Sequence, residues 1–155
     1  MEQQTMNNGK SYKLQNAIDE TDIQRQIEDH VKALCNMDLE GLMSIYSPDI
    51  VSFDVEGTYL GTEAKRKAWV NVFSMIEPPL NYEIRDLTIT IGSDVAFAYS
   101  YNRLSGKMKN GQQIGYWVRY TACFRKINGN WLIVHEQVSV PVDIENGRVL
   151  LDFKS

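Results

Sequence analysis

Residues 113–140 read QIGYWVRYTACFRKINGNWLIVHEQVSV, in which two largely apolar runs flank the triplet Asn128-Gly129-Asn130. In both runs large side chains recur about every second residue, which is the period of a β-strand. Asn-Gly between two such runs is typical of a tight hairpin, because both residues accept a positive φ. The stretch therefore predicts two antiparallel strands, from Gln113 to Lys126 and from Trp131 to Val140.

The strand period continues on both sides of this hairpin. Upstream it predicts a strand from Val95 to Leu104 and another from Tyr82 to Ile91, with a break or bulge near Arg85-Asp86. Downstream, Asn146-Gly147 indicates a last short hairpin that ends near Phe153. The C-terminal half is therefore expected to form an antiparallel meander.

Before residue 80 the apolar residues recur at helical spacing instead. One helix is expected to begin at Thr21-Asp22, a short second helix follows Asp38, and a third is capped by Thr62 and ends before Pro78-Pro79. Ser47-Pro48-Asp49 is expected to end the second helix, and residues 50–55 alternate like a strand. Helices followed by a run of strands predict an α+β domain over residues 21–155, with residues 1–20 as a polar N-terminal arm, either loose or a short helix.

Composition excludes several classes of protein. The chain has 155 residues, a net charge of −4 and no long run of Lys or Arg, so we expect no nucleic acid as partner. No apolar stretch reaches the roughly 20 residues that cross a bilayer, so we expect no membrane and a cytoplasmic location. His30 and His135 are the only histidines and have no metal-ligand spacing, so we expect no metal and no cofactor.

Several stretches, taken in order, resemble the nuclear transport factor two-like superfamily, which includes ketosteroid isomerases and SnoaL-like polyketide cyclases. The resemblance covers about residues 22–142. It rests on the following stretches: Ala33-Leu34-Cys35-Asn36-Met37-Asp38-Leu39-Glu40-Gly41-Leu42; Tyr46-Ser47-Pro48-Asp49-Ile50-Val51-Ser52-Phe53-Asp54; Gly61-Thr62-Glu63-Ala64 before Trp69; and Phe124 to His135 followed by Ser139-Val140-Pro141.

The resemblance implies a cone-shaped α+β barrel, in which three N-terminal helices pack on a strongly curved, mixed but mostly antiparallel sheet around one pocket. It also implies catalytic candidates, because Asp54 stands where the isomerases have their general base. His30 matches the position of their tyrosine donor and Ala122 that of their second donor, so ketosteroid isomerase activity itself is not expected. Two interpretations stay open for each residue. Asp54 is either the base in the pocket or a solvated turn residue. His30 is either a hydrogen-bond donor to a substrate carbonyl or a histidine buried in the core.

Strand alternation and the resemblance together suggest the lining of the pocket. Arg103 is left open, since inside the cone it would attract a carboxylate and outside it would be a solvated charge. The other face would carry Trp117, Arg119, Thr121, Trp131, Ile133 and His135, and its two tryptophans suggest a homodimer through the convex face of the sheet. The expected lining is Tyr46, Trp69, Tyr82, Phe97, Tyr99, Tyr101, Arg103, Tyr116, Tyr120, Glu136 and Val138.

Such a pocket would bind an apolar or aromatic small molecule that bears a carbonyl or a carboxylate. Three functions remain open from the sequence. The protein is an isomerase-, cyclase- or lyase-type acid–base catalyst without metal, a non-catalytic ligand-binding domain, or a dimeric interaction module. The last resembles the kinase-association members of the superfamily, although their pocket arginines are replaced near Ala122 and Val138.

Overall fold

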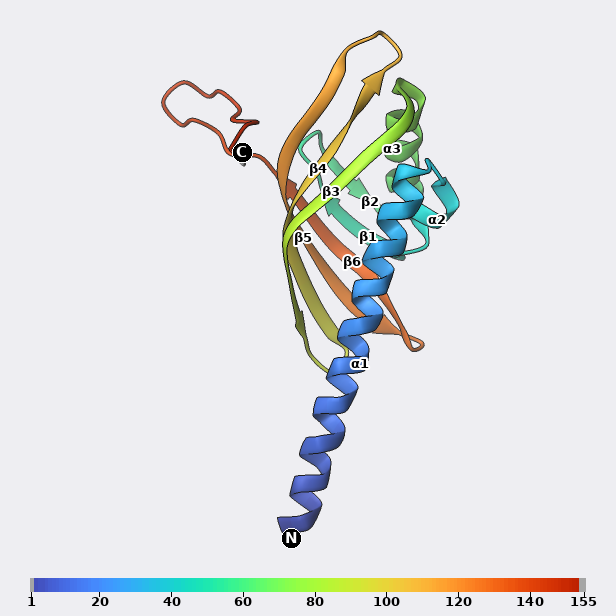
Figure 1. Ribbon diagram of the computed structural model, residues 1–155, viewed down its shortest axis with the longest axis vertical. Coiled ribbons are helices and arrows are strands. Elements are labelled where there is room, and N and C mark those ends of the chain that lie inside the picture. Colours follow the sequence, from blue (N-terminus) through green and yellow to red (C-terminus); the bar gives the residue numbers. More distant parts are fainter. Residues whose placement is uncertain (1, 154–155) are drawn as a thin grey trace.

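The computed structural model describes residues 2–153, with side chains from residue 9 onward. Helices are grouped before the long strands, as the sequence predicts (Figure 1). None of the helices within residues 2–153 is long and apolar enough to cross a membrane. The elements in chain order are α1 (Glu2–Cys35), α2 (Leu39–Met43), β1 (Tyr46–Phe53), β2 (Thr58–Leu60), α3 (Gly61–Met75), β3 (Ile76–Ile91), β4 (Val95–Met108), β5 (Gln113–Ile127) and β6 (Asn130–Ser139).

The strands form one sheet in the order β2-β1-β6-β5-β4-β3. Neighbouring strands are antiparallel except β1 and β6, which run parallel, so the predicted mixed, mostly antiparallel sheet is confirmed. The sheet is strongly curved but not closed, because β2 and β3 remain as its edges. Helix α1 packs against β3 and α3 against β1, while α2 joins the two helices.

Helix α1 begins well before the expected boundary at Thr21-Asp22 and runs without a break from Glu2. No proline interrupts residues 2–35, so nothing in this stretch forces the helix to stop. In Figure 1 its N-terminal half extends beyond the sheet. Tyr12, Leu14 and Ile18 are accordingly exposed. The residues expected as a separate arm therefore continue the first helix of the domain.

Asp19 marks the point at which α1 reaches the sheet. Its buried carboxylate accepts hydrogen bonds from Lys126 Nζ at 2.8 Å and from Trp131 Nε1 at 3.2 Å, both near the hairpin between β5 and β6. Burial raises the pKa of the Asp19 carboxyl, but these bonds and one from Gln15 outweigh it and hold the pKa below its usual value. The carboxylate therefore ties the long helix to the sheet.

Two predicted boundaries around β1 are wrong. Ser47-Pro48-Asp49 lies inside β1, because α2 ends at Met43 and the parallel pairing with β6 already begins at Tyr46. Thr62 does not cap α3, since Leu60 takes the N-cap position without a side-chain hydrogen bond. The short strand β2 before it was not predicted.

The structure supports the predicted turns better than it supports these two boundaries. Asn128 and Gly129 have φ of 50° and 81°, as a tight hairpin requires, and the register of β3 shifts between Arg85 and Thr88 at the predicted bulge. The last predicted hairpin is reduced to one isolated bridge between Val142 and Val149.

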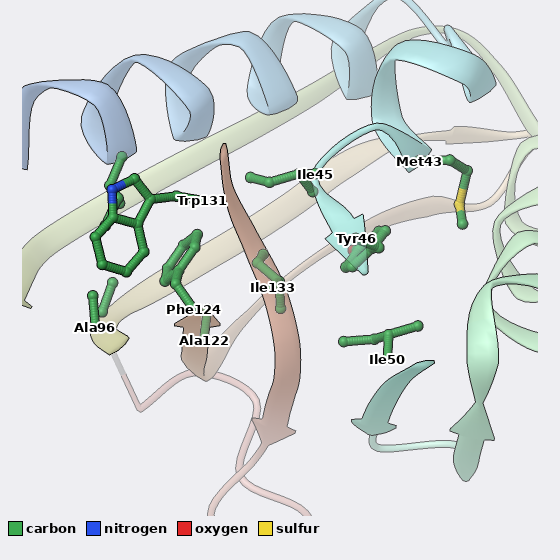
Figure 2. Packing of buried hydrophobic residues seen from close by; sticks show 11 residues of the cluster. Met43, Ile45, Tyr46, Ile50, Ala96, Ala122, Phe124, Trp131 and Ile133 are labelled. Atoms are coloured by element: carbon green, nitrogen blue, oxygen red, sulfur yellow. The ribbon is translucent and has the colours of Figure 1, made fainter. Parts of the chain in front are cut away.

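The main core lies between α1 and the sheet end at which β5 and β6 turn. Figure 2 shows Trp131 beside Phe124, with Ile133 toward Tyr46 and Ile50. A second cluster, around Leu34, Leu42 and Leu80, fills the space between the helices and β3. The two cores leave between them the hollow that holds the candidate site.

Candidate functional site

A cavity of about 340 Å³ lies between the helices and the concave face of the sheet. Its volume is within the range of small-molecule sites. Apolar side chains such as Ile27, Val72 and Leu104 form much of its wall. Of the residues expected at the pocket, the structure brings His30, Tyr46, Asp54, Trp69, Tyr82, Tyr116, Tyr120, Glu136 and Val138 to this cavity.

The other four expected residues, Phe97, Tyr99, Tyr101 and Arg103, lie on the opposite face of β4. Ala98, Ser100 and Asn102 line the cavity, so strand alternation turns their odd-numbered neighbours outward. Phe97 and Tyr99 are 43% and 49% exposed, and the Tyr101 ring contacts that of Phe153. The expectation that these four line the cavity is therefore wrong, and Arg103 is not available to bind a carboxylate there.

The expected convex face also needs correction on β6. Cys123 pairs with His135 but Phe124 pairs with Ile133, so Val134 is an extra residue and the alternation reverses there. Ile133 consequently lines the cavity and Trp131 enters the core. Trp117 does face outward, but the guanidinium of Arg85 lies 4.6 Å from the centre of its ring and the tryptophan is only 7% exposed.

Lys65 and Glu136 form an ion pair at the centre of the site, with side chains 3% and 1% exposed. Glu136 Oε1 contacts Lys65 Nζ and accepts a hydrogen bond from Ser52 Oγ at 2.8 Å. Glu136 Oε2 accepts from Tyr120 at 2.7 Å and from Tyr46 at 3.4 Å. Both carboxylate oxygens of Glu136 are thus occupied.

Burial by itself raises the pKa of the Glu136 carboxyl. The charge and hydrogen bond of Lys65, with the hydroxyl donors of Tyr120 and Ser52, outweigh burial and hold the pKa below its usual value. The Lys65 ammonium also lies 5.5–5.7 Å from the ring centres of Tyr46, Tyr59 and Trp69, which adds cation–π stabilisation. The pair is therefore charged and fixed.

Asp54 follows the last residue of β1 and opens a turn in which its N–H donates to the Gly57 carbonyl at 2.8 Å. Its Oδ1 accepts from the backbone N–H of Val55, and Oδ2 lies 3.5 Å from Lys65 Nζ. The side chain is 24% exposed and lines the cavity. Asp54 is therefore a turn residue and a cavity residue together, and Oδ2 has room for a further partner.

His30 lies on α1 with Nδ1 at 3.2 Å from the Leu42 carbonyl. A carbonyl oxygen can only accept, so Nδ1 carries the proton and Nε2 of the neutral ring is an acceptor. Burial lowers the pKa of His30 to about 4, so the ring stays neutral at physiological pH. This tautomer does not fit the expected role of donor to a substrate carbonyl.

Tyr82, on β3, completes the polar lining. Its hydroxyl oxygen accepts a hydrogen bond from Asn102 Nδ2 at 2.8 Å, and Asn102 Oδ1 accepts from Ser100 Oγ at 2.6 Å. Asn102 and Ser100 are buried neighbours on the cavity side of β4. Within the part of the chain that the structure describes, no three His, Cys, Asp or Glu side chains gather as a metal site.

Sequence reasoning missed Lys65, Ser52 and the Ser100–Asn102 pair. Lys65 precedes Ala68 and Trp69 at helical spacing, so a charged residue in the apolar stripe of α3 was a usable signal. Ser52 lies two residues before Asp54, but β1 is buried on both faces in part and shows no clean alternation. Ser100 and Asn102 are missed because the sequence-based expectation puts the odd-numbered residues of β4 in the pocket, which turns the even-numbered residues outward.

Fold and site together define an α+β domain of the NTF2-like type, with a ligand-sized cavity between the helices and a curved sheet. The chain belongs to the SnoaL-like domain family, whose model matches residues 14–143. No curated protein matches the sequence.

Solved structures agree with this assignment. An NTF2-like protein of unknown function from Pseudomonas putida KT2440 is 28% identical, with a TM-score of 0.80 over 90% of this chain and 98% of that one. A cystatin-like protein of unknown function from Nostoc punctiforme is 19% identical, with a TM-score of 0.68 over 81% and 92%. A hexachlorocyclohexane dehydrochlorinase, LinA type 2, is 19% identical, with a TM-score of 0.73 over 82% and 88%. The last two likenesses establish the fold alone.

Proposed function

We propose that the cavity binds an apolar or aromatic small molecule with a carbonyl group, and that Asp54 acts as the base that removes a proton next to this carbonyl. The observation that carries the proposal is the difference between the carboxylates at the cavity. Each Glu136 oxygen has two partners and the side chain is 1% exposed, while Glu56 is exposed to solvent. Each Asp54 oxygen accepts a single hydrogen bond, the one to Oδ2 from Lys65 at 3.5 Å, and the side chain is 24% exposed at the cavity. Among described lining residues, Asp54 is therefore the best placed proton acceptor.

The charges of the lining favour a carbonyl over a carboxylate. Lys65 is the single Lys or Arg side chain among the described residues that line the cavity, and it is bound to Glu136 and close to Asp54. Asp54, Glu56 and Glu136 outnumber this one cation among the lining residues, so an anionic ligand would enter a negatively charged cavity and lose its own hydration, both of which cost free energy. A neutral carbonyl avoids these costs and needs only a hydrogen-bond donor.

The chemistry fits what this fold can hold. The name of the dehydrochlorinase that shares the fold describes removal of hydrogen chloride, a reaction in which a base takes a proton from carbon. Its sequence is too distant to transfer a substrate. It supports only the narrower idea that this fold can host the removal of a proton from carbon.

The ligand class is tested by comparing three ring-matched compounds: α-tetralone, the carboxylate tetrahydronaphthoate, and tetralin, which has no polar group. We expect the ketone to bind, to raise the free energy of unfolding by about 2.7 kcal/mol at a hundred times its dissociation constant, and to outcompete the other two. Calorimetric titration and thermal unfolding measure both quantities. Tighter binding of the carboxylate, or no binding of the ketone, would contradict the proposed ligand class.

We further propose that the protein is a homodimer through the outer face of the sheet. Val95, Phe97 and Tyr99 are exposed in a row on β4, and the rings of Phe97 and Tyr99 stack with centres 6.5 Å apart. An apolar patch of this kind is typical of an interface. The mass of the protein in solution tests this, and a monomer at all concentrations would refute it.

A further inference from the structure

Three of the tyrosines that line the cavity, Tyr46, Tyr82 and Tyr120, are not equivalent as hydrogen-bond donors. Tyr46 and Tyr120 both donate their protons to Glu136 Oε2, so these protons are not free for a ligand. Tyr82 instead receives a hydrogen bond, from Asn102. Its own proton has no acceptor among the side chains that the structure describes.

The direction of this second network is fixed by its chemistry. An amide oxygen can only accept, so Asn102 Oδ1 takes the proton of the Ser100 hydroxyl. The amide nitrogen can only donate, so Tyr82 accepts from Asn102 Nδ2. Ser100 and Asn102 are buried, so bulk water has little access to these bonds. Ser100 and Asn102 therefore orient the Tyr82 hydroxyl with its proton available.

We propose that Tyr82 donates this proton in a hydrogen bond to the carbonyl oxygen of the ligand, and that Ser100 and Asn102 are positioning residues for this donor. The inference rests on the proposed function, which supplies the carbonyl ligand. Tyr82 thereby takes the role of donor to the ligand carbonyl, which His30 cannot fill because Nε2 of its neutral ring is an acceptor.

Tyr82 and Asp54 line the same cavity, so one ligand can contact both. Asp54 Oδ2 takes a proton from the carbon next to the carbonyl, and the C–H electron pair moves into a new C=C bond while the C=O π pair moves to oxygen. The hydrogen bond that the Tyr82 hydroxyl donates to the carbonyl oxygen becomes stronger as negative charge develops on that oxygen. Return of the proton from Asp54 to carbon completes the cycle without any co-reactant.

The hydroxyl of Tyr82 remains a donor over the whole working range of pH. Burial raises the pKa of Tyr82 well above its ordinary value, and the nearby carboxylates of Glu136 and Asp54 add to this, although the bond from Asn102 acts in the opposite direction. The side chain is therefore neutral and protonated when a ligand arrives.

The test is the infrared band of α-tetralone labelled with carbon-13 at the carbonyl and bound to the protein. A hydrogen bond to the carbonyl lowers its stretching frequency, so we expect a lower frequency in the wild type than in Tyr82→Phe, and about two- to tenfold weaker binding in the variant. Asn102→Asp should have the same effect on the band, because a carboxylate accepts the Tyr82 proton and removes it from the ligand. Tyr12→Phe, which changes an exposed tyrosine on the N-terminal half of α1, is the matched control and should change neither readout.

Binding and band position separate the two proposals. A ketone that binds the wild type and Tyr82→Phe with the same band would overturn the role of Tyr82 and leave the cavity proposal standing. A band that moves in Tyr82→Phe but not in Asn102→Asp would overturn the positioning role of Asn102. A wild type that binds no ketone would overturn the ligand class and, with it, this inference. Thermal unfolding of each variant without ligand confirms that it is folded.

Discussion

Lys65 is the residue on which the geometry of the site depends most. It is almost completely buried, and its ammonium lies among Glu136, Ser52 and Asp54. Two opposite charges out of water are tolerated only while each has its partner. Removing the cation leaves Glu136 buried without compensation.

We therefore expect Lys65→Met to lower the free energy of unfolding by about 3–5 kcal/mol in urea denaturation at pH 7. Lys65→Met with Glu136→Gln should recover part of this, because no charge is then left unpaired. Lys32→Met, which removes an exposed lysine paired with Asp29, is the control and should cost less than about 1 kcal/mol. A loss for Lys65→Met as small as the control would refute the buried ion pair.

The pair of Lys65 and Glu136 also determines the direction in which the free energy of unfolding changes with pH. The folded pKa of Glu136 is below the ordinary value of 4.5, so its contribution to stability is complete above pH 4.5 and is lost as the pH falls through the folded pKa. In Lys65→Met the carboxyl instead binds a proton more readily when folded. The difference in stability between wild type and variant should consequently shrink in acid.

At the level of elements, the strand pattern predicted the type and order of the elements but not every face. The Asn128-Gly129 turn and the bulge near Asp86 have local signals, because both require a positive φ. The extra residue Val134 has none, since it follows from pairing with β5 and not from its own sequence. The sequence therefore predicts the wrong face for Trp131 and Ile133. On β4 the alternation is regular, and the error for Phe97 and Tyr99 has another cause, because a period of two does not tell which of the two faces lines the cavity.

The exposed face of β4 gives the second test at this level. If the homodimer uses Val95, Phe97 and Tyr99, a double variant Phe97→Glu and Tyr99→Glu should halve the mass measured by light scattering, because charges in an apolar interface are not compensated. Leu14→Glu on the exposed N-terminal half of α1 is the control and should leave the mass unchanged. A double variant that remains dimeric would place the interface elsewhere.

Considered as a whole, the molecule uses its helices to close one side of a curved, open sheet. The family resemblance predicted this architecture and placed Asp54 at the cavity, because the order of motifs fixes the order of elements. It did not predict the network of Lys65, Ser52 and Glu136, because these three side chains meet only after β1, α3 and β6 have been assembled. Side-chain networks that join distant segments have no local sequence pattern.

The central claim is that Asp54 moves a proton at a bound carbonyl compound. The most direct measurement is the incorporation of deuterium from D₂O at the carbon next to the carbonyl of α-tetralone, followed by NMR with wild type, Asp54→Asn and the surface control Asp29→Asn. We predict catalysed exchange in the wild type and the control, and exchange at least a hundredfold slower in Asp54→Asn, with ketone binding retained. Binding of the ketone without exchange above the buffer rate in the wild type would contradict the claim and identify the domain as a non-catalytic binding module.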